Sequence, residues 1–400
     1  MNTPLVSFSI VSYNNYKYIK EALVSVFAQD YPRIQLIISN DGSADFNEQE
    51  LCLFIEENKG SNIEEVIVKN HKTNQGTVRN VEYCREQSHG DFLMFMAADD
   101  GLNGSNVLSR YVEEFESLGD EALVLCSRVA MCSESLDEIE SYEPSESGIE
   151  VIKNSTPEEL FGRLSHTWTI PTTSCMYRKE MYAEVGGGYD TEYYIMEDGP
   201  LFIKLARNGI RIHWLDHFTA ALHRGGGISH GNTLNLSEGY RKYRYDEIIF
   251  YEKEVLPFKE RLNKKDEALM EAKWDYVSKA YFEQFVRPNM TGIEKFNYAM
   301  SHLPQYLKGM LHRIKEKAVG WIEDNYLNRN MMIVCLWSLI AYALLVYRVV
   351  PLPFANETTI LIIKIFLGLS ILNGCFAIFL RVMRIVRHLW LTLKYIVIGR

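Results

Sequence analysis

The chain has 400 residues, of which 52 are Asp or Glu and 42 are Lys or Arg, and its formal net charge is -10. This acidic balance argues against nucleic acid as the main partner, because binding to a phosphate backbone requires a basic face. Seven cysteines are scattered along the chain without a C-x-x-C pair. We therefore expect reduced thiols in a cytosolic compartment, and neither a disulfide framework nor a zinc site.

The N-terminal part of the chain begins with a strand, a helix and a second strand. Leu5–Ser12 is predicted as the first strand, and Gln35–Ser39 as the second, which ends at Asn40-Asp41-Gly42-Ser43. A helix between them is indicated by apolar residues at helical spacing, namely Ile19, Ala22, Leu23, Val26 and Phe27. This arrangement is a βαβ unit, which is right-handed by default.

The pattern then repeats. Leu51–Asn58 is predicted as a helix and Glu65–Lys69 as a strand, and Asn74-Gln75-Gly76 opens a further helix. The six apolar residues Phe92–Ala97 predict a strand that is covered on both faces, as in a parallel sheet flanked by helices. The first half of the chain is therefore predicted to be a doubly wound α/β fold that binds a nucleotide at its strand ends.

Two adjacent carboxylates, Asp99 and Asp100, follow the Phe92–Ala97 strand. They lie where ligands of such sheets bind, and they would repel a phosphate unless a hard cation such as Mg²⁺ or Mn²⁺ lay between. The pair therefore suggests a metal–diphosphate site. The alternative is that one of them only caps the next helix, since Asp is a preferred cap residue.

The middle of the chain is less regular. Ser133–Glu150 is rich in Ser and Glu and is predicted to be a mobile loop. Gly209 is expected to cap the end of one helix. The remaining predicted elements are the helices Val107–Leu118 and Leu201–Asn208 and the strands Ala122–Met131, Ser174–Tyr177 and Ile210–Leu215.

The C-terminal part is predicted to contain helices and a membrane anchor. Leu236–Asn328 is expected to be a helical appendage, and Met331–Val350 and Thr359–Leu380 are two apolar stretches of about membrane-spanning length. Positive charge on both outer flanks favours a hairpin with both ends in the cytoplasm. Val382–Arg400 suits an interfacial helix. The alternative is a buried hairpin in a soluble domain. The predicted domains are thus 1–235, 236–328 and 329–400.

Several motifs in order resemble those of the GT-A glycosyltransferases of family 2. They cover roughly Pro4 to Ser229 and comprise Ser9-Ile10-Val11-Ser12-Tyr13-Asn14, Asn40-Asp41-Gly42-Ser43, Asn74-Gln75-Gly76, Asp99-Asp100, the glycine turn Gly186 to Asp190, and Glu197-Asp198. The resemblance implies a GT-A fold with a mostly parallel sheet and the activity of a non-processive glycosyltransferase.

The resemblance also implies roles for residues. Asp41 would accept a hydrogen bond from the imide N–H of a uracil or thymine ring, although Asn-Asp-Gly-Ser is also good chemistry for an Asx turn. Asp99 and Asp100 would bind Mg²⁺ or Mn²⁺, and Asp198 would be the general base beside Glu197. The residues expected to bind the nucleotide are Ser12, Tyr13, Asn14, Asp41, Gly76, Arg79, Ala98 and Arg224.

Two further segments bear on this resemblance. His223 and Arg224 precede the run Gly225-Gly226-Gly227 and resemble the segment where the family brings a His or Arg to the diphosphate. A solvated loop is the alternative for His223. The family often has a carboxylate two residues before Asp99, where this chain has Ala97.

The sequence therefore predicts an inverting, membrane-anchored glycosyltransferase. It would transfer a sugar from a nucleotide-sugar donor, expected to be a UDP-sugar, to a hydroxyl of a lipid-linked glycan or oligosaccharide acceptor in surface polysaccharide assembly. The catalytic domain would lie on the cytoplasmic face of the inner (plasma) membrane. The alternatives are a polyprenyl-phosphate glycosyltransferase and a catalytically degenerate protein that only binds nucleotide sugar or glycan, the latter motivated by Ala97.

Overall fold

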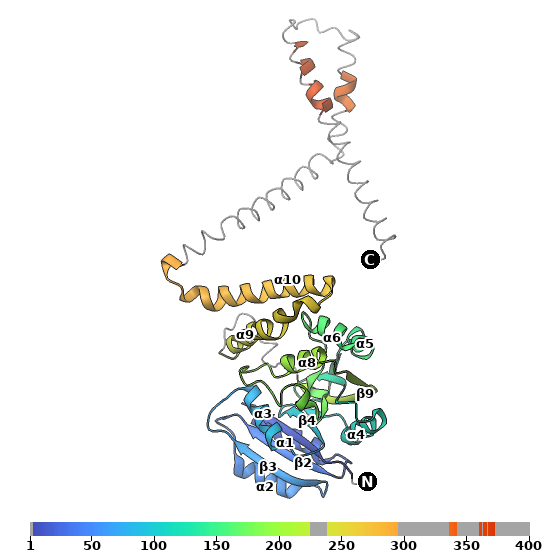
Figure 1. Cartoon of the computed structure of the whole chain (residues 1–400). Coiled ribbons are helices and arrows are strands. Elements are labelled where there is room, and N and C mark those ends of the chain that lie inside the picture. The colour runs from blue at the N-terminus through green and yellow to red at the C-terminus, as the bar shows by residue number, and fades with distance from the viewer. Residues whose placement is uncertain are drawn as a thin grey trace. The chain divides into compact units, whose positions relative to one another are not determined.

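The fold is given by a computed structural model, which describes residues 3–224, 238–294, 336–341, 360–361, 363–365 and 367–372. The chain divides into two compact units, Met1–Asn289 and Met290–Arg400. The first unit contains the sheet and nearly all of the described helices (Figure 1). Every feature discussed below as part of the site lies in this unit.

A nine-stranded sheet forms the centre of the first unit. Its order is β3-β2-β1-β4-β8-β6-β9-β5, and β7 pairs with β6. The strands are β1 Val6–Ser12, β2 Ile34–Asn40, β3 Ile63–Asn70, β4 Phe92–Ala97, β5 Gly101–Leu102, β6 Val124–Cys132, β7 Ile139–Glu143, β8 Met176–Arg178 and β9 Ile212–Arg224.

Strand direction divides the sheet into two parts. Strands β3, β2, β1 and β4 are parallel neighbours, as the sequence predicted for this half. The short strand β8 runs antiparallel to both β4 and β6, whereas β6 and β9 are parallel to each other. The predicted α/β sheet is therefore confirmed, but it is mixed and not mostly parallel: of its eight pairings among the described strands, four are parallel and four are antiparallel.

Ten α-helices are described in the first unit, together with short 3₁₀ and π segments. The helices are α1 Ile19–Phe27, α2 Glu48–Asn58, α3 Thr77–Gln87, α4 Val107–Leu118, α5 Glu146–Asn154, α6 Pro157–Leu164, α7 Met181–Glu184, α8 Asp198–Arg207, α9 Glu238–Phe250 and α10 Lys264–Tyr281. Gly209, with a φ of +82°, follows α8, as expected for a residue at the end of a helix.

The two faces of the sheet bury separate apolar clusters. In β4, Phe92 and Met94 pack into one cluster with α1 and α4, while Leu93 between them packs into the other with α3 and α8. This alternation follows from the two-residue period of a strand, which points successive side chains to opposite faces. The continuous apolar run in the sequence thus reflects burial on both faces.

Helices α9 and α10 are part of this core and not an appendage. Phe250 of α9 and Met270 and Val277 of α10 belong to the same buried cluster as Phe161 of α6 and Leu201 of α8. Figure 1 shows α10 at the end of the unit farthest from β2 and β3. We expected a domain boundary after residue 235, but the first unit extends to Asn289 because these helices bury one face of the sheet layer.

Two elements between β5 and α9 differ from prediction. The segment Ser133–Glu150, expected to be a mobile loop, contains β7 and the start of α5. All five residues of β7 are exposed, so the strand is held by main-chain pairing to β6 and leaves no apolar alternation. The strand predicted at Ile210–Leu215 begins at Ile212 and continues to Arg224, because β6 and β5 pair with its second half.

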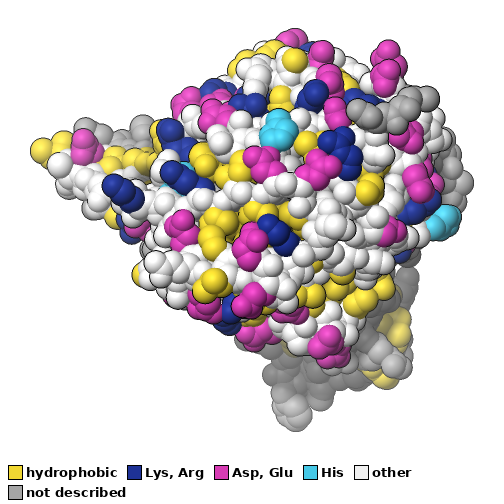
Figure 2. Space-filling view, turned by 90° about the horizontal axis from the view of Figure 1, so that it is seen from below, with side chains coloured by type: hydrophobic (Ala, Val, Ile, Leu, Met, Phe, Trp, Pro, Cys, Tyr) yellow, Lys and Arg dark blue, Asp and Glu magenta, His cyan; other side chains and the backbone are white. Residues whose placement is uncertain are grey.

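The predicted membrane hairpin lies largely outside the described residues. Only short helical pieces within Met331–Val350 and Thr359–Leu380 are described, and Val382–Arg400 is outside them entirely. Within the parts that the structure describes, no helix is both long and apolar enough to cross a bilayer. On the face shown in Figure 2, described acidic and basic side chains are interspersed and neither sign forms a continuous patch.

Gln29 connects α1 to α4 through four hydrogen bonds. Its Oε1 accepts from the N–H groups of Val107 (3.0 Å) and Leu108 (3.2 Å), and its Nε2 donates to the main-chain oxygen of Gly104 (2.7 Å) and to that of Ser25 (3.0 Å). The first N–H groups of a helix have no partner within it, and α4 has no side-chain cap of its own. The buried Gln29 therefore caps α4 from outside.

We expect Gln29→Ala to lower the free energy of unfolding by about 2 kcal/mol, because it leaves buried donors and acceptors without partners. Urea unfolding of the full chain, followed by circular dichroism, measures this loss. Gln49→Ala, at an exposed position of α2, is the matched control. Equal stability of the two variants would contradict a capping role for Gln29.

Candidate active site

The loops that follow β1, β2 and β4 are bonded to one another at one edge of the sheet. Asn14, with a φ of +55°, donates its N–H to Oγ of Ser43 (2.8 Å) after β2. Asn15 accepts a hydrogen bond from Ser12 Oγ (2.8 Å) and donates Nδ2–H to Oδ1 of Asp99 (3.0 Å) after β4. The motifs that the sequence placed at strand ends therefore form one connected surface.

Asp41 fixes the loop that precedes α3. Its Oδ1 accepts from the N–H of Gln75 (2.8 Å) and its Oδ2 from that of Gly76 (2.9 Å). Burial raises the pKa of Asp41, while these two donors act in the opposite direction. A Cβ at Gly42 would lie 2.7 Å from the carbonyl carbon of Thr73, so glycine is required for this close approach. Each oxygen of Asp41 retains a lone pair for a further donor.

The other residues predicted to bind the nucleotide differ in exposure. Tyr13 is 45% exposed, and Asn14 and Arg79 are also exposed. Ser12 and Ala98 are buried beneath them. Gly76 has a φ of +95°, and a Cβ added at this position would lie 2.4 Å from the main-chain oxygen of Tyr194. Exposed aromatic and cationic side chains at this edge are thus available to a base and a phosphate.

The two carboxylates after β4 have different environments. Asp100 is 1% exposed, and its Oδ1 accepts from Nδ1 of His223 (2.8 Å) and from the N–H of Arg224 (3.3 Å). Asp99 is partly exposed, and its Oδ1 accepts from Asn15. We expected both to bind a metal. Asp100, however, is buried and links the end of β4 to the end of β9 through hydrogen bonds. The metal assignment therefore remains a prediction for Asp99.

His223 and Arg224 are both held in the structure. Burial of His223 disfavours its charged form, but the hydrogen bond and charge of Asp100 outweigh this and raise the pKa of His223. The guanidinium of Arg224 donates to Glu21 Oε2 and to the main-chain oxygens of Asp99 and Glu134, each at 2.5 Å. Arg224 thereby fastens β9 to the strand-end loops, and its expected contact with a diphosphate stays a prediction.

The residues at this edge fit a divalent cation that is held jointly with a diphosphate. The described residues contain no group of three or more His, Cys, Asp or Glu side chains arranged around one metal position. A hard cation such as Mg²⁺ is commonly bound by one or two carboxylates, with substrate phosphates and water as its other ligands. Asp99 supplies one such carboxylate, oriented by Asn15.

Glu197 and Asp198 lie at the start of α8. Asp198 is the first residue of this helix, a position that favours negative charge. Its Oδ2 accepts from Thr172 Oγ1 (2.8 Å) and its Oδ1 from the N–H of Gly199 (2.7 Å). These two bonds fix the orientation of the carboxylate and leave further lone pairs free to accept a proton.

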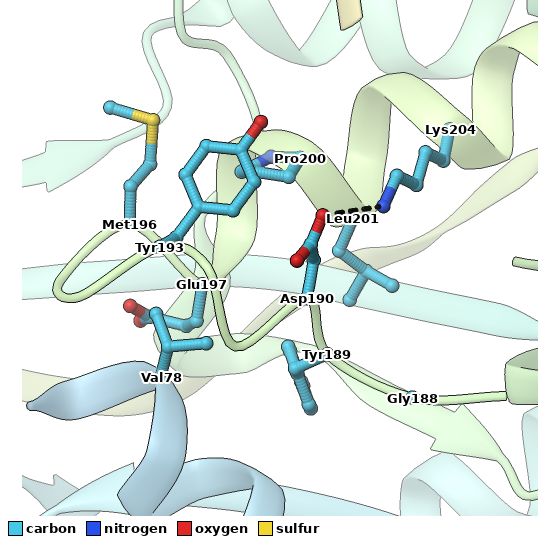
Figure 3. Close-up of a pocket in the computed structure, with 10 residues that line it drawn as sticks. All are labelled: Val78, Gly188, Tyr189, Asp190, Tyr193, Met196, Glu197, Pro200, Leu201 and Lys204. Carbon is cyan, nitrogen blue, oxygen red and sulfur yellow. Dashed lines mark ion pairs between the residues drawn. The ribbon is translucent and has the colours of Figure 1, made fainter. Parts of the chain in front are cut away.

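Glu197 has less polar surroundings than Asp198. Figure 3 shows its side chain near Val78 of α3, in a small cavity that Pro200 and Leu201 also line. The cavity volume is about 10 Å³, which is room for little more than one water molecule. Burial raises the pKa of Glu197 to about 8, with a further contribution from the charge of Asp198. Glu197 is therefore mostly protonated at neutral pH.

A second, much larger cavity also borders this pair. Its volume is about 910 Å³, and Glu197 and Asp198 both line it. Thr77 at the start of α3 and His223, which contacts Asp100, line the same cavity. The cavity thus connects the start of α8 with the ends of the strands, and it is large enough for a sugar-sized ligand.

Asp246 of α9 holds the loop that carries Glu197 and Asp198. This residue is fully buried, and its carboxylate accepts from the N–H groups of Tyr194 (3.0 Å), Ile195 (2.6 Å) and Met196 (3.0 Å). Sequence analysis did not single it out, because its partners are main-chain groups about 50 residues away and have no side-chain signature. Asp246 is therefore a positioning residue for the Glu197–Asp198 pair.

Comparison with known proteins agrees with this geometry. Residues 7–186 match the model of the family described as glycosyl transferase family 2. These residues are thus similar to the glycosyltransferases of family 2. The expected resemblance to this family is confirmed over this part of the chain.

The relatives share parts of their length with this chain. EpsH of Bacillus subtilis, named as a glycosyltransferase, is 36% identical over 134 residues, which are 32% of this chain and 35% of that protein. An uncharacterized glycosyltransferase of Nostoc sp., alr2836, is 26% identical over 198 residues, which are 48% of this chain and 57% of that protein. The chain therefore spans about a third and just over half of these relatives.

Solved structures of glycosyltransferases are also similar in part. S. aureus TarS in complex with UDP has a TM-score of 0.43 at 15% identity, covering 70% of this chain and 80% of that chain. The mannosyltransferase PcManGT from Pyrobaculum calidifontis, in complex with GDP-Man and Mn²⁺, has a TM-score of 0.44 at 15% identity, covering 76% and 81% respectively.

We expect Asp246→Asn to loosen the loop at Tyr194–Met196, because an amide group replaces one of the two accepting oxygens and faces main-chain donors. Hydrogen exchange of a peptide covering these residues should become faster, and sugar transfer should fall about 10- to 100-fold through misplacement of the carboxylates. Asp275→Asn, on the surface of α10, is the matched control. Unchanged exchange in this peptide would rule out the positioning role.

The raised pKa of Glu197 predicts a pH effect on stability. The folded state retains a proton on Glu197 up to about pH 8, whereas the unfolded state loses it near the ordinary pKa of 4.5 for a glutamate. Stability from this group is therefore complete below pH 4.5 and is lost as pH rises to about 8. We expect the Tm of the wild type to fall more than that of Glu197→Gln between pH 5 and pH 9. Parallel curves for the two proteins would contradict this assignment.

Proposed function

We propose that the protein is an inverting glycosyltransferase that uses a nucleoside-diphosphate sugar, expected to be a UDP-sugar, and a glycan hydroxyl as acceptor. The observation that carries this proposal is the position of Asp198 on the wall of the 910 Å³ cavity. The cavity reaches His223 and, through it, the Asp100 end of β4. A donor at the strand ends and an acceptor in the cavity would therefore meet near Asp198.

The proposed chemistry is a single displacement. The acceptor oxygen attacks the anomeric carbon from the side opposite the diphosphate, while the bond from this carbon to the diphosphate oxygen breaks. The hydroxyl proton moves to the carboxylate of Asp198, which Thr172 and the N–H of Gly199 hold in place. Glu197 is mostly protonated at neutral pH, so Asp198 is the stronger candidate for the base.

A divalent cation is part of this proposal. When bound, it would offset the charge of the departing diphosphate, and Asp99 is the residue that would help to hold it. Asn15 orients the Asp99 carboxylate for this role. Asp41 would accept the imide N–H of the uracil ring while it continues to hold the loop before α3.

The identity of the acceptor and the cellular location extend this proposal. We favour a lipid-linked glycan in surface polysaccharide assembly at the cytoplasmic face of the inner membrane, supported by the apolar stretches Met331–Val350 and Thr359–Leu380. A polyprenyl-phosphate glycosyltransferase is the alternative enzyme, but its acceptor is already an anion and needs no base. A degenerate binding protein is the alternative suggested by Ala97.

The experiment that tests the function measures release of nucleoside diphosphate from UDP-glucose, UDP-galactose, UDP-N-acetylglucosamine and GDP-mannose. Each donor is tested with Mn²⁺, with Mg²⁺ and with a chelator. We expect release from a UDP-sugar that requires the cation. Binding of a donor without any release, with or without acceptor, would favour the degenerate binding protein.

We expect Asp198→Asn to lower kcat by about two to four orders of magnitude, the range for loss of a general base. The donor KM should change little, because the substitution keeps the shape of the side chain and Asp198 does not belong to the strand-end surface. Asp216→Asn, at an exposed position of β9, is the matched control. Turnover within a few-fold of the wild type would exclude Asp198 as the base and favour the polyprenyl-phosphate alternative.

A further inference from the structure

We infer that the wall of the large cavity around Trp168 is a subsite for a neutral pyranose ring of the acceptor. This inference rests on the proposed function, because it assigns the acceptor class of the same site. Three features of the described residues carry it: an exposed indole held beside the base, polar atoms on the wall without partners, and a balance of charge around the cavity.

The indole of Trp168 is exposed although it is packed on one side. It is 45% exposed and lines the cavity, while its ring centroid lies 5.4 Å from that of Phe250. A Cβ at Gly199 would lie 2.3 Å from Cη2 of Trp168, so only glycine at this position lets the indole lie against the first turn of α8. Since Asp198 directly precedes Gly199, the indole lies next to the proposed base.

An aromatic face at this place suits a sugar ring. A pyranose presents C–H groups on its faces and hydroxyl groups around its edge, so it combines apolar contact with hydrogen bonding. Trp offers a large, rigid surface with few torsions to restrict on binding. Tyr243, beside the same cavity, and the exposed Tyr142 extend this aromatic surface.

The polar atoms near Trp168 lack partners. Oγ1 of Thr169 and Nε of Arg163 are buried atoms of residues that line the cavity, and neither has a hydrogen-bond partner among the residues that the structure describes. Buried polar atoms are normally paired, because an unpaired one is costly. Because both residues line the cavity, hydroxyl groups of a ligand there are candidate partners for these atoms. Thr167 and Thr173 add hydroxyl groups to the same wall.

The charge of the cavity favours a neutral ligand. Its acidic lining consists of Glu143, Glu197 and Asp198, and its basic lining of Arg163 and His223. Acidic and basic side chains therefore both line the cavity, and neither sign dominates. This balance offers no net attraction for the phosphate of a polyprenyl phosphate or for a uronic acid.

The test measures sugar binding without turnover. Saturation-transfer NMR on the full chain uses the methyl glycosides of glucose, galactose, mannose and N-acetylglucosamine, and undecaprenyl phosphate in detergent as a separate probe. We expect a signal from at least one glycoside with the wild type and with Trp168→Phe, and its loss with Trp168→Ala. Tyr276→Ala, which removes another exposed aromatic side chain, from α10, should retain the signal.

Kinetics supply the second measurement. With an oligosaccharide acceptor that carries the binding sugar, Trp168→Ala should raise the acceptor KM about 10- to 100-fold, as expected for loss of an aromatic anchor. Trp168→Phe should restore most of the acceptor affinity. Circular dichroism and the Tm of Trp168→Ala, compared with those of the wild type, show whether this variant is folded.

The outcomes separate this inference from the proposed function. A glycoside signal that depends on Trp168, in a protein that releases no nucleotide from any donor, supports the subsite and overturns the transferase proposal. The subsite is overturned if no glycoside binds the wild type, if the signal persists in Trp168→Ala, or if only undecaprenyl phosphate binds.

Discussion

The buried carboxylate of Asp100 is the interaction on which the geometry of the site depends. It joins the end of β4, in the parallel part of the sheet, to the end of β9 through His223 and the N–H of Arg224. Arg224 then extends the connection to Glu21 and to the main chain of Asp99. Burial of a charged group is costly unless the group is paired, so the Asp100 carboxylate needs these partners. The same connection leaves Asp99 as the partly exposed carboxylate at the end of β4.

The start of α8 shows how one short segment separates two chemical roles. Glu197 contacts the apolar surroundings of Val78, Pro200 and Leu201 and keeps its proton, while Asp198 is held by polar donors beside the large cavity. Neighbouring carboxylates whose environments differ in this way are commonly assigned different roles in proton transfer. Packing near α3 contributes to the environment of Glu197, and Thr172 in the loop before β8 contributes to that of Asp198. Both environments therefore depend on residues that are distant in the sequence.

Much of the fold was predictable because its signals are local. The parallel strands β1, β2 and β4 are rich in apolar residues and are followed by polar turn residues, and each exit loop lies where the sequence predicted it. The rest depends on contacts that leave no local pattern. Strand β7 exposes all five side chains and exists through pairing with β6. Asp100 and Arg224 are residue types that often bind ligands. In this structure both are buried, and Asp100 accepts a hydrogen bond from the N–H of Arg224. Asp246 accepts hydrogen bonds from main-chain N–H groups that are far away in the sequence.

The contribution of α9 to the loop before α8 has a consequence for biosynthesis. The sheet, the strand-end loops and the Glu197–Asp198 pair are all encoded before residue 225, but the carboxylate that restrains this pair comes from Asp246. In a nascent chain, the strand-end loops are therefore complete before the carboxylate that holds the loop at Tyr194–Met196 has been synthesised. During translation, the strand-end surface and the loop before α8 thus reach their final form at different times.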